Sequence, residues 1–160
     1  GARVFESGVG SGALSMTLLR AGADVTGYEL REDFAERART NVVAMLGEAA
    51  LCGYQVQIRD AYNGIDETDL DRVILDLPEP WQVVPHAARA LHSGGIILAY
   101  TPSVVQASRF HEALDEYRFG FTETIEVLHR NWHIEGDAVR PDHRMVAHTG
   151  FLSHARLLGS

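Results

Sequence analysis

The sequence contains no lysine, because all fourteen of its lysine-or-arginine residues are arginines. A Walker A phosphate loop requires a lysine, and so does a Schiff-base mechanism, so both are excluded. Cysteine is almost absent as well. Cys52 is the single cysteine, which excludes an internal disulfide and a metal centre built from several thiolates.

Long apolar runs are also missing. No stretch approaches the roughly 20 residues that a transmembrane helix needs, and no charged segment followed by an apolar one has the form of a leader peptide. We therefore expect a soluble, cytoplasmic protein. The 160 residues, of which 46% are hydrophobic, suffice for one well-buried domain and are too few for two ordinary ones, so residues 1–160 are expected to form a single domain.

The most informative segment is a short apolar run that leads into a glycine-rich turn and then into a helix-like pattern. Gly8, Gly10 and Gly12 permit positive φ angles and let a ligand approach bare main chain. The predicted helix start, from Ser11 to Ala13, offers unpaired N–H groups. The spacing also fits the dinucleotide fingerprint G-x-G-x-x-G/A, so a nicotinamide dinucleotide and S-adenosylmethionine (SAM) both remain possible ligands.

Two acids near the glycines help to separate these ligands. Glu6 precedes the first glycine by two residues, where a carboxylate would oppose a pyrophosphate and favour the sulfonium and ammonium cations of SAM. The alternative is a solvated residue at a strand end. Glu29 ends the next apolar run, where an acid can accept hydrogen bonds from both ribose hydroxyls of either ligand. Its alternative role is to place negative charge at the start of the following helix.

Apolar runs alternate with helical patterns along the first two thirds of the chain, which predicts a Rossmann-like α/β fold with a parallel, doubly wound sheet. The expected strands are 3–7, 25–29, 55–59, 72–76 and 95–100, and the expected helices are about 13–21, 32–46, 81–91 and 103–117.

The final third predicts two strands without an intervening helix, at about 121–130 and 144–157, joined by a polar stretch that contains Gly136 and Pro141. Consecutive strands of this kind pair most simply in an antiparallel manner, so we expect the sheet to end in an antiparallel pair. That ending is typical of SAM-dependent methyltransferases, whereas a six-stranded dinucleotide fold stays parallel. Alternation in the second strand places His148 on a polar face that would meet RNA or another subunit.

A second group of chemically active residues follows the strand expected at 72–76. Asp76 stands at the carboxyl end of that strand, which is where open α/β sheets bind ligands. Pro78 and Pro80 fix φ and lack N–H groups, so they predict a rigid, irregular loop that directs Asp76 and Trp81 into one cleft. Trp81 could instead serve only for packing at the start of the next helix.

Five segments of the chain carry recognisable motifs. They are Glu6-Ser-Gly-Val-Gly-Ser-Gly-Ala-Leu-Ser15, Tyr28-Glu-Leu-Arg-Glu32, Asp76-Leu-Pro-Glu-Pro-Trp81, Ala99-Tyr-Thr-Pro102 and Arg140-Pro-x-His-Arg-Met-Val-x-His-Thr-Gly-Phe151. In this order they resemble the bacterial and archaeal tRNA (adenine-58-N1) methyltransferases, and the similarity covers essentially the whole chain. The resemblance implies a class I methyltransferase that uses SAM to methylate N1 of adenosine 58 in the T-loop of tRNA, usually as a homotetramer.

The motifs and this resemblance together give a candidate cofactor site. It comprises Glu6, Gly8, Gly10, Ser11, Gly12, Ala13, Glu29, Leu30, Asp60 and Asp76. By resemblance, Asp60 would accept a hydrogen bond from the adenine amino group of SAM, and Leu30 would give the same ring an apolar surface.

Methyl transfer to adenine N1 needs no strong base, because that nitrogen has a free lone pair. The product ring is cationic, so a fixed carboxylate at its N6 edge would stabilise charge that develops in the transition state, and we assign this role to Asp76. The target base must leave the folded tRNA to react, and Trp81 or Tyr100 could stack on it. Tyr100 could equally be a strand-end residue without a functional role.

The net charge of −8 argues against a domain that binds RNA by itself, because affinity for phosphates comes from clustered cations. Arg140, Arg144 and His148 are candidate tRNA contacts, and binding would rely on surfaces assembled across subunits. The β-rich N-terminal domain of the family is expected to be absent, since the chain starts directly before its first strand. The histidines match no metal-ligand spacing, so no metal is expected.

Three alternatives stay open. The chain could be a SAM-dependent methyltransferase of another substrate, which would share the glycine loop and Glu29 without needing the segment from Asp76 to Trp81. It could be a non-catalytic subunit of an RNA-modifying complex, although its intact glycines argue against this. A nicotinamide-dependent oxidoreductase is disfavoured by Glu6 and by the antiparallel ending.

Overall fold

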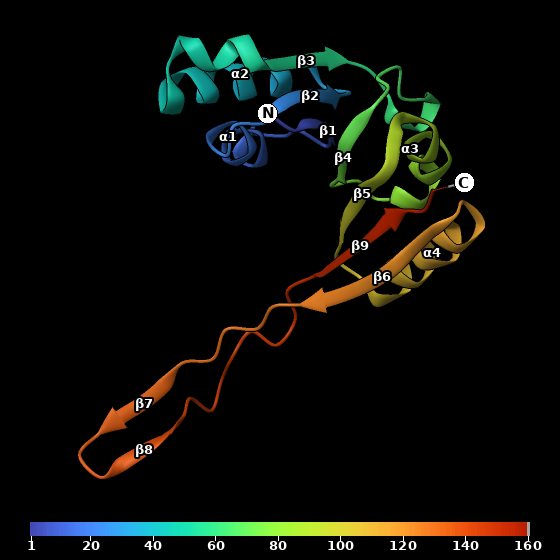
Figure 1. The fold of residues 1–160 in the computed structure, drawn as a ribbon. Coiled ribbons are helices and arrows are strands. Elements are labelled where there is room, and N and C mark those ends of the chain that lie inside the picture. Colours follow the sequence, from blue (N-terminus) through green and yellow to red (C-terminus); the bar gives the residue numbers. More distant parts are fainter. Residues whose placement is uncertain (160) are drawn as a thin grey trace.

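Seven strands form one sheet, which organises residues 1–159, the part of the chain that this computed structural model describes. Their order across the sheet is β3-β2-β1-β4-β5-β9-β6 (Figure 1). The strands of this sheet are β1 (Arg3–Ser7), β2 (Asp24–Glu29), β3 (Tyr54–Ile58), β4 (Leu70–Leu75), β5 (Leu91–Thr101), β6 (Phe119–Glu126) and β9 (Phe151–Leu157).

The first five strands pair only in parallel with one another, which confirms the expected α/β class. β1 pairs with both β2 and β4, so Ser7 at its carboxyl end lies opposite Tyr28 on one side and Leu75 on the other. The strand order reverses direction at this point, with β2 and β3 on one side and β4 and β5 on the other. Open α/β sheets bind ligands at such a switch point.

Helices cover both faces of the sheet. They are α1 (Ala13–Arg20), α2 (Glu32–Leu46), α3 (Val84–Ala90) and α4 (Val104–Glu116), with 3₁₀ segments η1 (Glu48–Gly53), η2 (Ala61–Asn63) and η3 (Pro80–Val83). On one face α1 and α2 pack with Val4 and Val25, whereas on the other α3 and α4 pack with Phe5 and Val73. Val4 and Phe5 are neighbours in β1, so the two cores follow from the alternation of a strand that is buried on both faces. None of the helices in residues 1–159 combines the length and apolar content of a bilayer-spanning segment.

The helix expected at 81–91 is divided into two parts. Residues Pro80–Val83 form η3, and the α-helix begins only at Val84. Pro85 lies in the first turn of α3, where its missing N–H has no helical partner to lose. The prolines therefore set the start of the α-helix later than the apolar pattern predicted.

The last strand, β9, lies between β5 and β6 and runs antiparallel to both. The sheet thus has the antiparallel ending that the sequence predicted. The strands expected at 121–130 and 144–157 extend too far towards each other, because β6 ends at Glu126 and β9 begins only at Phe151. His148, which was expected on a polar face of this strand, lies outside it.

The segment between β6 and β9, residues 127–150, extends away from the sheet as an arm (Figure 1). The stretch expected to be a polar connection forms a ribbon of two strands, β7 (Trp132–Glu135) and β8 (Ala138–Pro141), which turns at Gly136 with φ of +55°. Sequence analysis missed this ribbon because it has no buried face. Even Ile134 exposes 73% of its surface. The ribbon therefore lacks the alternation of buried apolar and exposed polar residues by which a strand is recognised in a sequence.

Candidate functional site

The glycine loop lies at the carboxyl end of β1 and approaches two other segments closely. Gly8, Gly10 and Gly12 all have positive φ, at +86°, +55° and +79°. A Cβ on Gly8 would stand 2.1 Å from the carbonyl oxygen of Asp76, and one on Gly12 would stand 3.1 Å from Cα of Ala38 in α2. The loop therefore needs glycine both for its backbone conformation and for its packing against the neighbouring segments.

The carboxylate of Glu29 is held by two main-chain N–H groups, one in the glycine loop and one two residues after Glu29 itself. The N–H of Gly10 donates to its Oε2 at 3.0 Å, and the N–H of Arg31 donates to its Oε1 at 3.1 Å. Each oxygen keeps acceptor capacity for a further hydrogen bond. Ser11 is exposed and its carbonyl accepts from Nδ2 of Asn41 at 2.9 Å, which ties the loop to α2.

A cavity of about 180 Å³ opens beside this loop, and the carboxyl ends of neighbouring strands contribute to its lining. Its lining comprises Ser7, Gly8, Tyr28, Glu29, Leu30, Arg59, Asp60, Ala61, Tyr62, Leu77 and Pro78. Four of the predicted cofactor residues, which are up to 52 positions apart in the sequence (60 minus 8), thus meet in one place. Leu30 exposes 62% of its surface there, so it is available to a ligand rather than part of the core.

Asp60 takes part in the local structure of the cavity wall. Its Oδ1 accepts a hydrogen bond from the N–H of Tyr62 at 2.9 Å and caps η2. The Tyr62 hydroxyl in turn accepts from the N–H of Glu79 at 3.1 Å, which connects this wall to the proline-containing loop after β4. Ala13 is the exposed first residue of α1, at the other end of the site.

Glu6 lies beneath the glycine loop rather than at its mouth. Only 1% of its surface is exposed, because the alternation of β1 turns it towards the same face as Val4. The hydroxyl of Ser15 in α1 donates to its Oε2 at 2.6 Å. The pKa of Glu6 is raised to about 7, chiefly by desolvation; the hydrogen bond from Ser15 opposes this rise and the charge of nearby Asp76 adds to it.

Asp76 occupies the predicted position at the end of β4. Its N–H donates to the carbonyl of Ser7 at 2.9 Å, so its main chain continues the pairing of β4 with β1. The side chain is exposed, yet partial desolvation at the concave edge raises its pKa. The loop that follows is fixed by Gln106 of α4, whose Nε2 donates to the carbonyl of Pro78 at 2.9 Å.

The two aromatic candidates are held away from the cavity lining. Trp81 contacts α4, with the guanidinium of Arg109 5.4 Å from its ring centroid, and the two side chains share a separate depression. The Tyr100 hydroxyl donates to the carbonyl of Thr149 at 3.0 Å. A Cβ on Gly150 would stand 2.3 Å from the Tyr100 ring, so the C-terminal motif lets the returning chain pass directly over this tyrosine.

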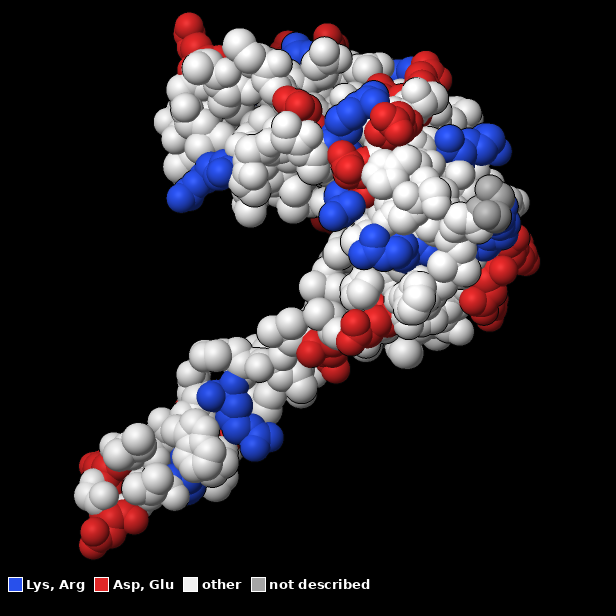
Figure 2. Space-filling model, in the orientation of Figure 1, with Lys and Arg blue, Asp and Glu red and all other residues white. Residues whose placement is uncertain are grey.

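The candidate tRNA contacts lie in the arm. Arg140 belongs to β8 and pairs in register with His133, and Arg144 lines a small depression together with His129. Figure 2 shows basic side chains along the arm and acidic ones at its tip. His148 lies next to the start of β9, with its ring 6.2 Å from that of Phe151. The structure thus separates the arm arginines from the cofactor candidates, which stand on the sheet.

Sequence reasoning missed several residues of the cavity wall. The guanidinium of Arg59 lies 4.8 Å from the Tyr28 ring and donates to the Tyr28 hydroxyl at 3.0 Å. Arg59 also forms an ion pair with Asp66. The signal that could have identified Arg59 and Tyr62 is their place on either side of Asp60, directly after β3.

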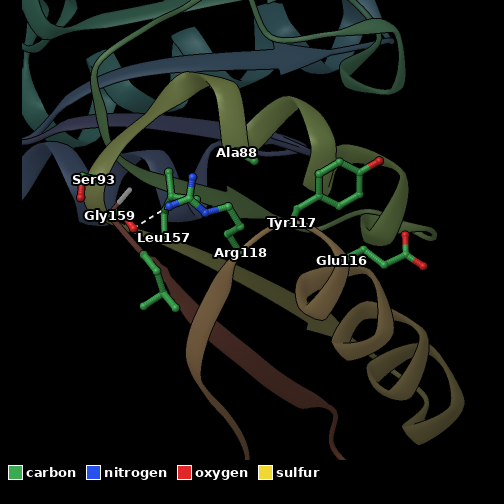
Figure 3. Close-up of a pocket in the computed structure, with 8 residues that line it drawn as sticks. Ala88, Ser93, Glu116, Tyr117, Arg118, Leu157 and Gly159 are labelled. Carbon is green, nitrogen blue, oxygen red and sulfur yellow. Dashed lines mark hydrogen bonds between the residues drawn. The ribbon is translucent and has the colours of Figure 1, made fainter.

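A further depression lies at the opposite, amino-terminal edge of the parallel strands (Figure 3). Its walls include Ser93 at the start of β5, Arg118 before β6, and Gly159 after β9. The Arg118 guanidinium donates to the Gly159 carbonyl across it. None of the predicted site residues lies there, and residues 1–159 contain no group of three or more His, Cys, Asp or Glu side chains arranged to hold a metal ion.

Comparison with known proteins agrees with this arrangement. The family model described as the tRNA methyltransferase complex GCD14 subunit matches residues 1–139. The chain belongs to this family. The glycine loop and the Asp76 segment both lie inside the matched region.

Three relatives place the GCD14-family chain among methyltransferases. The tRNA (adenine(57)-N(1)/adenine(58)-N(1))-methyltransferase TrmI of Methanocaldococcus jannaschii is 35% identical over 184 aligned residues, which cover 98% of this chain and 65% of that protein. The crystal structure of the Aquifex aeolicus tRNA (m1A58) methyltransferase TrmI has a TM-score of 0.80 at 28% identity, covering 99% of this chain and 63% of that one. A SAM-dependent O-methyltransferase structure from Thermotoga maritima has a TM-score of 0.87 at 32% identity, covering 100% and 60%.

The fold is therefore that of class I SAM-dependent methyltransferases. The chain spans less than two thirds of the length of these three relatives.

Proposed function

We propose that the protein binds SAM at the carboxyl edge of its sheet and methylates N1 of adenosine 58 in tRNA. The observation that carries this proposal is the cavity in which Gly8, Glu29 and Asp60 meet from the ends of three neighbouring strands. Family membership and the Methanocaldococcus jannaschii relative support the choice of substrate.

The residues present fit SAM by their chemistry. The main chain at Gly8 is open to close approach, and the carboxylate of Glu29 can accept from the ribose hydroxyls while Gly10 and Arg31 hold it in place. Asp60 would accept from the adenine amino group, and the exposed Leu30 would cover one face of that ring. The buried acid beneath the loop is unfavourable for a pyrophosphate, which argues against a nicotinamide dinucleotide.

Bound SAM would supply an electrophilic methyl group, and the chain supplies charge and orientation. Asp76 stands at the edge of the site as a carboxylate that can accept from the adenine N6 amino group, which also distinguishes adenine from guanine. Because its surroundings are partly desolvated, positive charge that develops on the base is stabilised more strongly there than in water. Tyr100 is the next-to-last residue of β5, near the same edge, and we assign it a role in holding the base, as we do Trp81.

We also propose that the full enzyme is a homotetramer whose tRNA-binding surface spans subunits. An isolated two-stranded ribbon is marginally stable in water, and the arm leaves Trp132, Ile134, Val139 and Val146 more than half exposed. A partner subunit would cover these exposed apolar residues. Arginines brought together from several arms would supply the clustered positive charge that a chain with a net charge of −8 needs to bind tRNA. Arg140, Arg144 and His148 are the proposed tRNA contacts in this arrangement.

Methylation of another substrate is the second candidate function, because the Thermotoga maritima structure is described as a SAM-dependent O-methyltransferase. Mass mapping of nucleosides separates the two. The protein is incubated with SAM and an unmodified tRNA transcript, and with a matched transcript that carries uridine at position 58. We expect 1-methyladenosine only in the first transcript.

A transcript that stays unmethylated while SAM binds would favour the other substrate or a non-catalytic subunit. Addition of a candidate partner subunit then distinguishes those two outcomes, because methylation of the transcript that appears only with the partner shows that the chain acts within a tRNA-modifying complex.

A further inference from the structure

A chain of three buried side chains connects the face beneath the glycine loop to the edge strand β3. The hydroxyl of Tyr54 in β3 donates to Oγ of Ser15 at 3.1 Å, and Ser15 donates to Oε2 of Glu6 at 2.6 Å. The three residues are 5%, 0% and 1% exposed. Buried carboxyl groups are rare unless they are paired with a cation, and Glu6 is instead bonded to a hydroxyl, that of Ser15.

The charged groups around this chain come from each element that packs against it. Asp76, after β4, lies close enough for its charge to raise the pKa of Glu6. Burial raises the pKa of Tyr54 to about 12, and the positive charge of Arg39 in α2 partly opposes that rise. Tyr54 is therefore protonated and remains a hydrogen-bond donor at neutral pH. Arg39 itself donates to the carbonyl of Val56 at 2.6 Å, so its guanidinium is directed at β3 and not at Glu6.

We propose that Ser15 and Tyr54 are positioning residues that hold the Glu6 carboxyl group beneath the loop, so that the site binds the cationic methyl donor in preference to its neutral product. This inference rests on the proposed function, because it requires SAM at the glycine loop. It goes beyond that function in assigning roles to two side chains that do not line the cofactor cavity.

The direction of the effect follows from the charge of the ligand. With its pKa near 7, Glu6 is mostly neutral at pH 6 and mostly ionised at pH 8. The sulfonium of SAM favours the ionised form, whereas S-adenosylhomocysteine has a neutral thioether at the same position. Both ligands carry the same ammonium and carboxylate groups, so the ratio of their affinities isolates the sulfonium. That ratio should rise with pH across pH 6 to 8.

Isothermal titration calorimetry with SAM and S-adenosylhomocysteine at pH 6, 7 and 8 tests this inference. For the unaltered protein we expect the affinity ratio to rise about threefold to tenfold, since a tenfold change corresponds to one pKa unit. Glu6→Gln should make the ratio independent of pH. Ser15→Ala removes the hydrogen bond that lowers the pKa of Glu6, so the rise should move to higher pH. Tyr54→Phe should also move the rise in the affinity ratio to higher pH, but by a smaller amount.

Thr17→Ala is the matched control, because Thr17 lies on the same helix and bonds only to the carbonyl of Ala13. It should leave the pH profile unchanged. Circular dichroism establishes that each variant is folded, and Tyr54→Phe carries the test if Ser15→Ala is not. A ratio that does not vary with pH, or one that rises equally in Glu6→Gln, overturns the inference and leaves the proposed function intact. Absence of binding by both ligands at every pH refutes the proposed function as well.

Discussion

Replacement of Gly8 by alanine tests the packing on which the cofactor site depends. The new Cβ would stand 2.1 Å from the carbonyl oxygen of Asp76 and 3.4 Å from its Cβ, and the residue would keep a φ of +86°. Gly22→Ala is the matched control, because Gly22 has a φ of +83° with no described atom within 4 Å of the position of a Cβ. The two variants share the backbone strain and differ in the steric conflict.

The expected losses of folding free energy differ accordingly. An L-residue in the left-handed region costs about 1–2 kcal/mol, which is the whole expected cost of Gly22→Ala. Gly8→Ala adds the conflict with main chain at the switch point, for which overpacking suggests about 1–3 kcal/mol more. At roughly 2–4 °C per kcal/mol for a chain of this size, the Tm should fall by about 2–8 °C in the control and about 4–20 °C in Gly8→Ala.

Thermal denaturation followed by circular dichroism measures both values, and calorimetry with SAM below the Tm measures binding. We expect Gly8→Ala to lose both more stability and more affinity than Gly22→Ala. Equal Tm values for the two variants would show that the loop moves away from Asp76 at no cost. That result would refute the argument that the contact between β1 and β4 fixes the shape of the site.

Three further predictions concern ligand binding and turnover. Glu29→Ala should weaken SAM binding at least tenfold, about 1.4 kcal/mol, as measured by calorimetry, because two ribose hydrogen bonds to a charged acceptor are lost; unchanged affinity would place the cofactor elsewhere. Asp76→Ala should leave SAM binding largely intact and lower the single-turnover methylation rate by about 10²-fold or more, and a near-normal rate with normal tRNA binding would remove Asp76 from the mechanism. Arg140→Glu should weaken tRNA binding in a filter assay while SAM affinity stays the same, and equal losses of both would contradict a role confined to tRNA.

The parallel part of the fold was predictable because each of its strands is a short apolar run that can be recognised in the sequence by itself. Runs such as Val73-Ile-Leu75 are short and apolar, and such a run is enough to indicate a strand of a parallel sheet. The end of β9 nearest the arm was not predictable in this way. Its apolar alternation continues upstream of Phe151, but the chain leaves the sheet where Gly150 passes over Tyr100, a contact that depends on β5.

The candidate cofactor residues were predictable where a motif fixed them to a strand end. Glu29 and Asp60 follow directly from the rule that ligands bind at the carboxyl ends of parallel strands, and both line the cavity. The direction of Trp81 was not predictable, since a loop with two prolines can present an indole to either side. Its position against Arg109 is set by α4, 28 residues further along the chain (109 minus 81).

The position of β9 has a consequence for how the protein is made. β5 and β6 are separated in the sheet by a strand that follows both of them in the sequence, so neither can complete its pairing until residues 151–157 have been synthesised. During translation, one edge of β5 therefore stays open while the whole of α4, β6 and the arm emerges. An unpaired strand edge is a template for association with other chains. The growing polypeptide must protect that edge until β9 enters between β5 and β6, two strands that have already been synthesised.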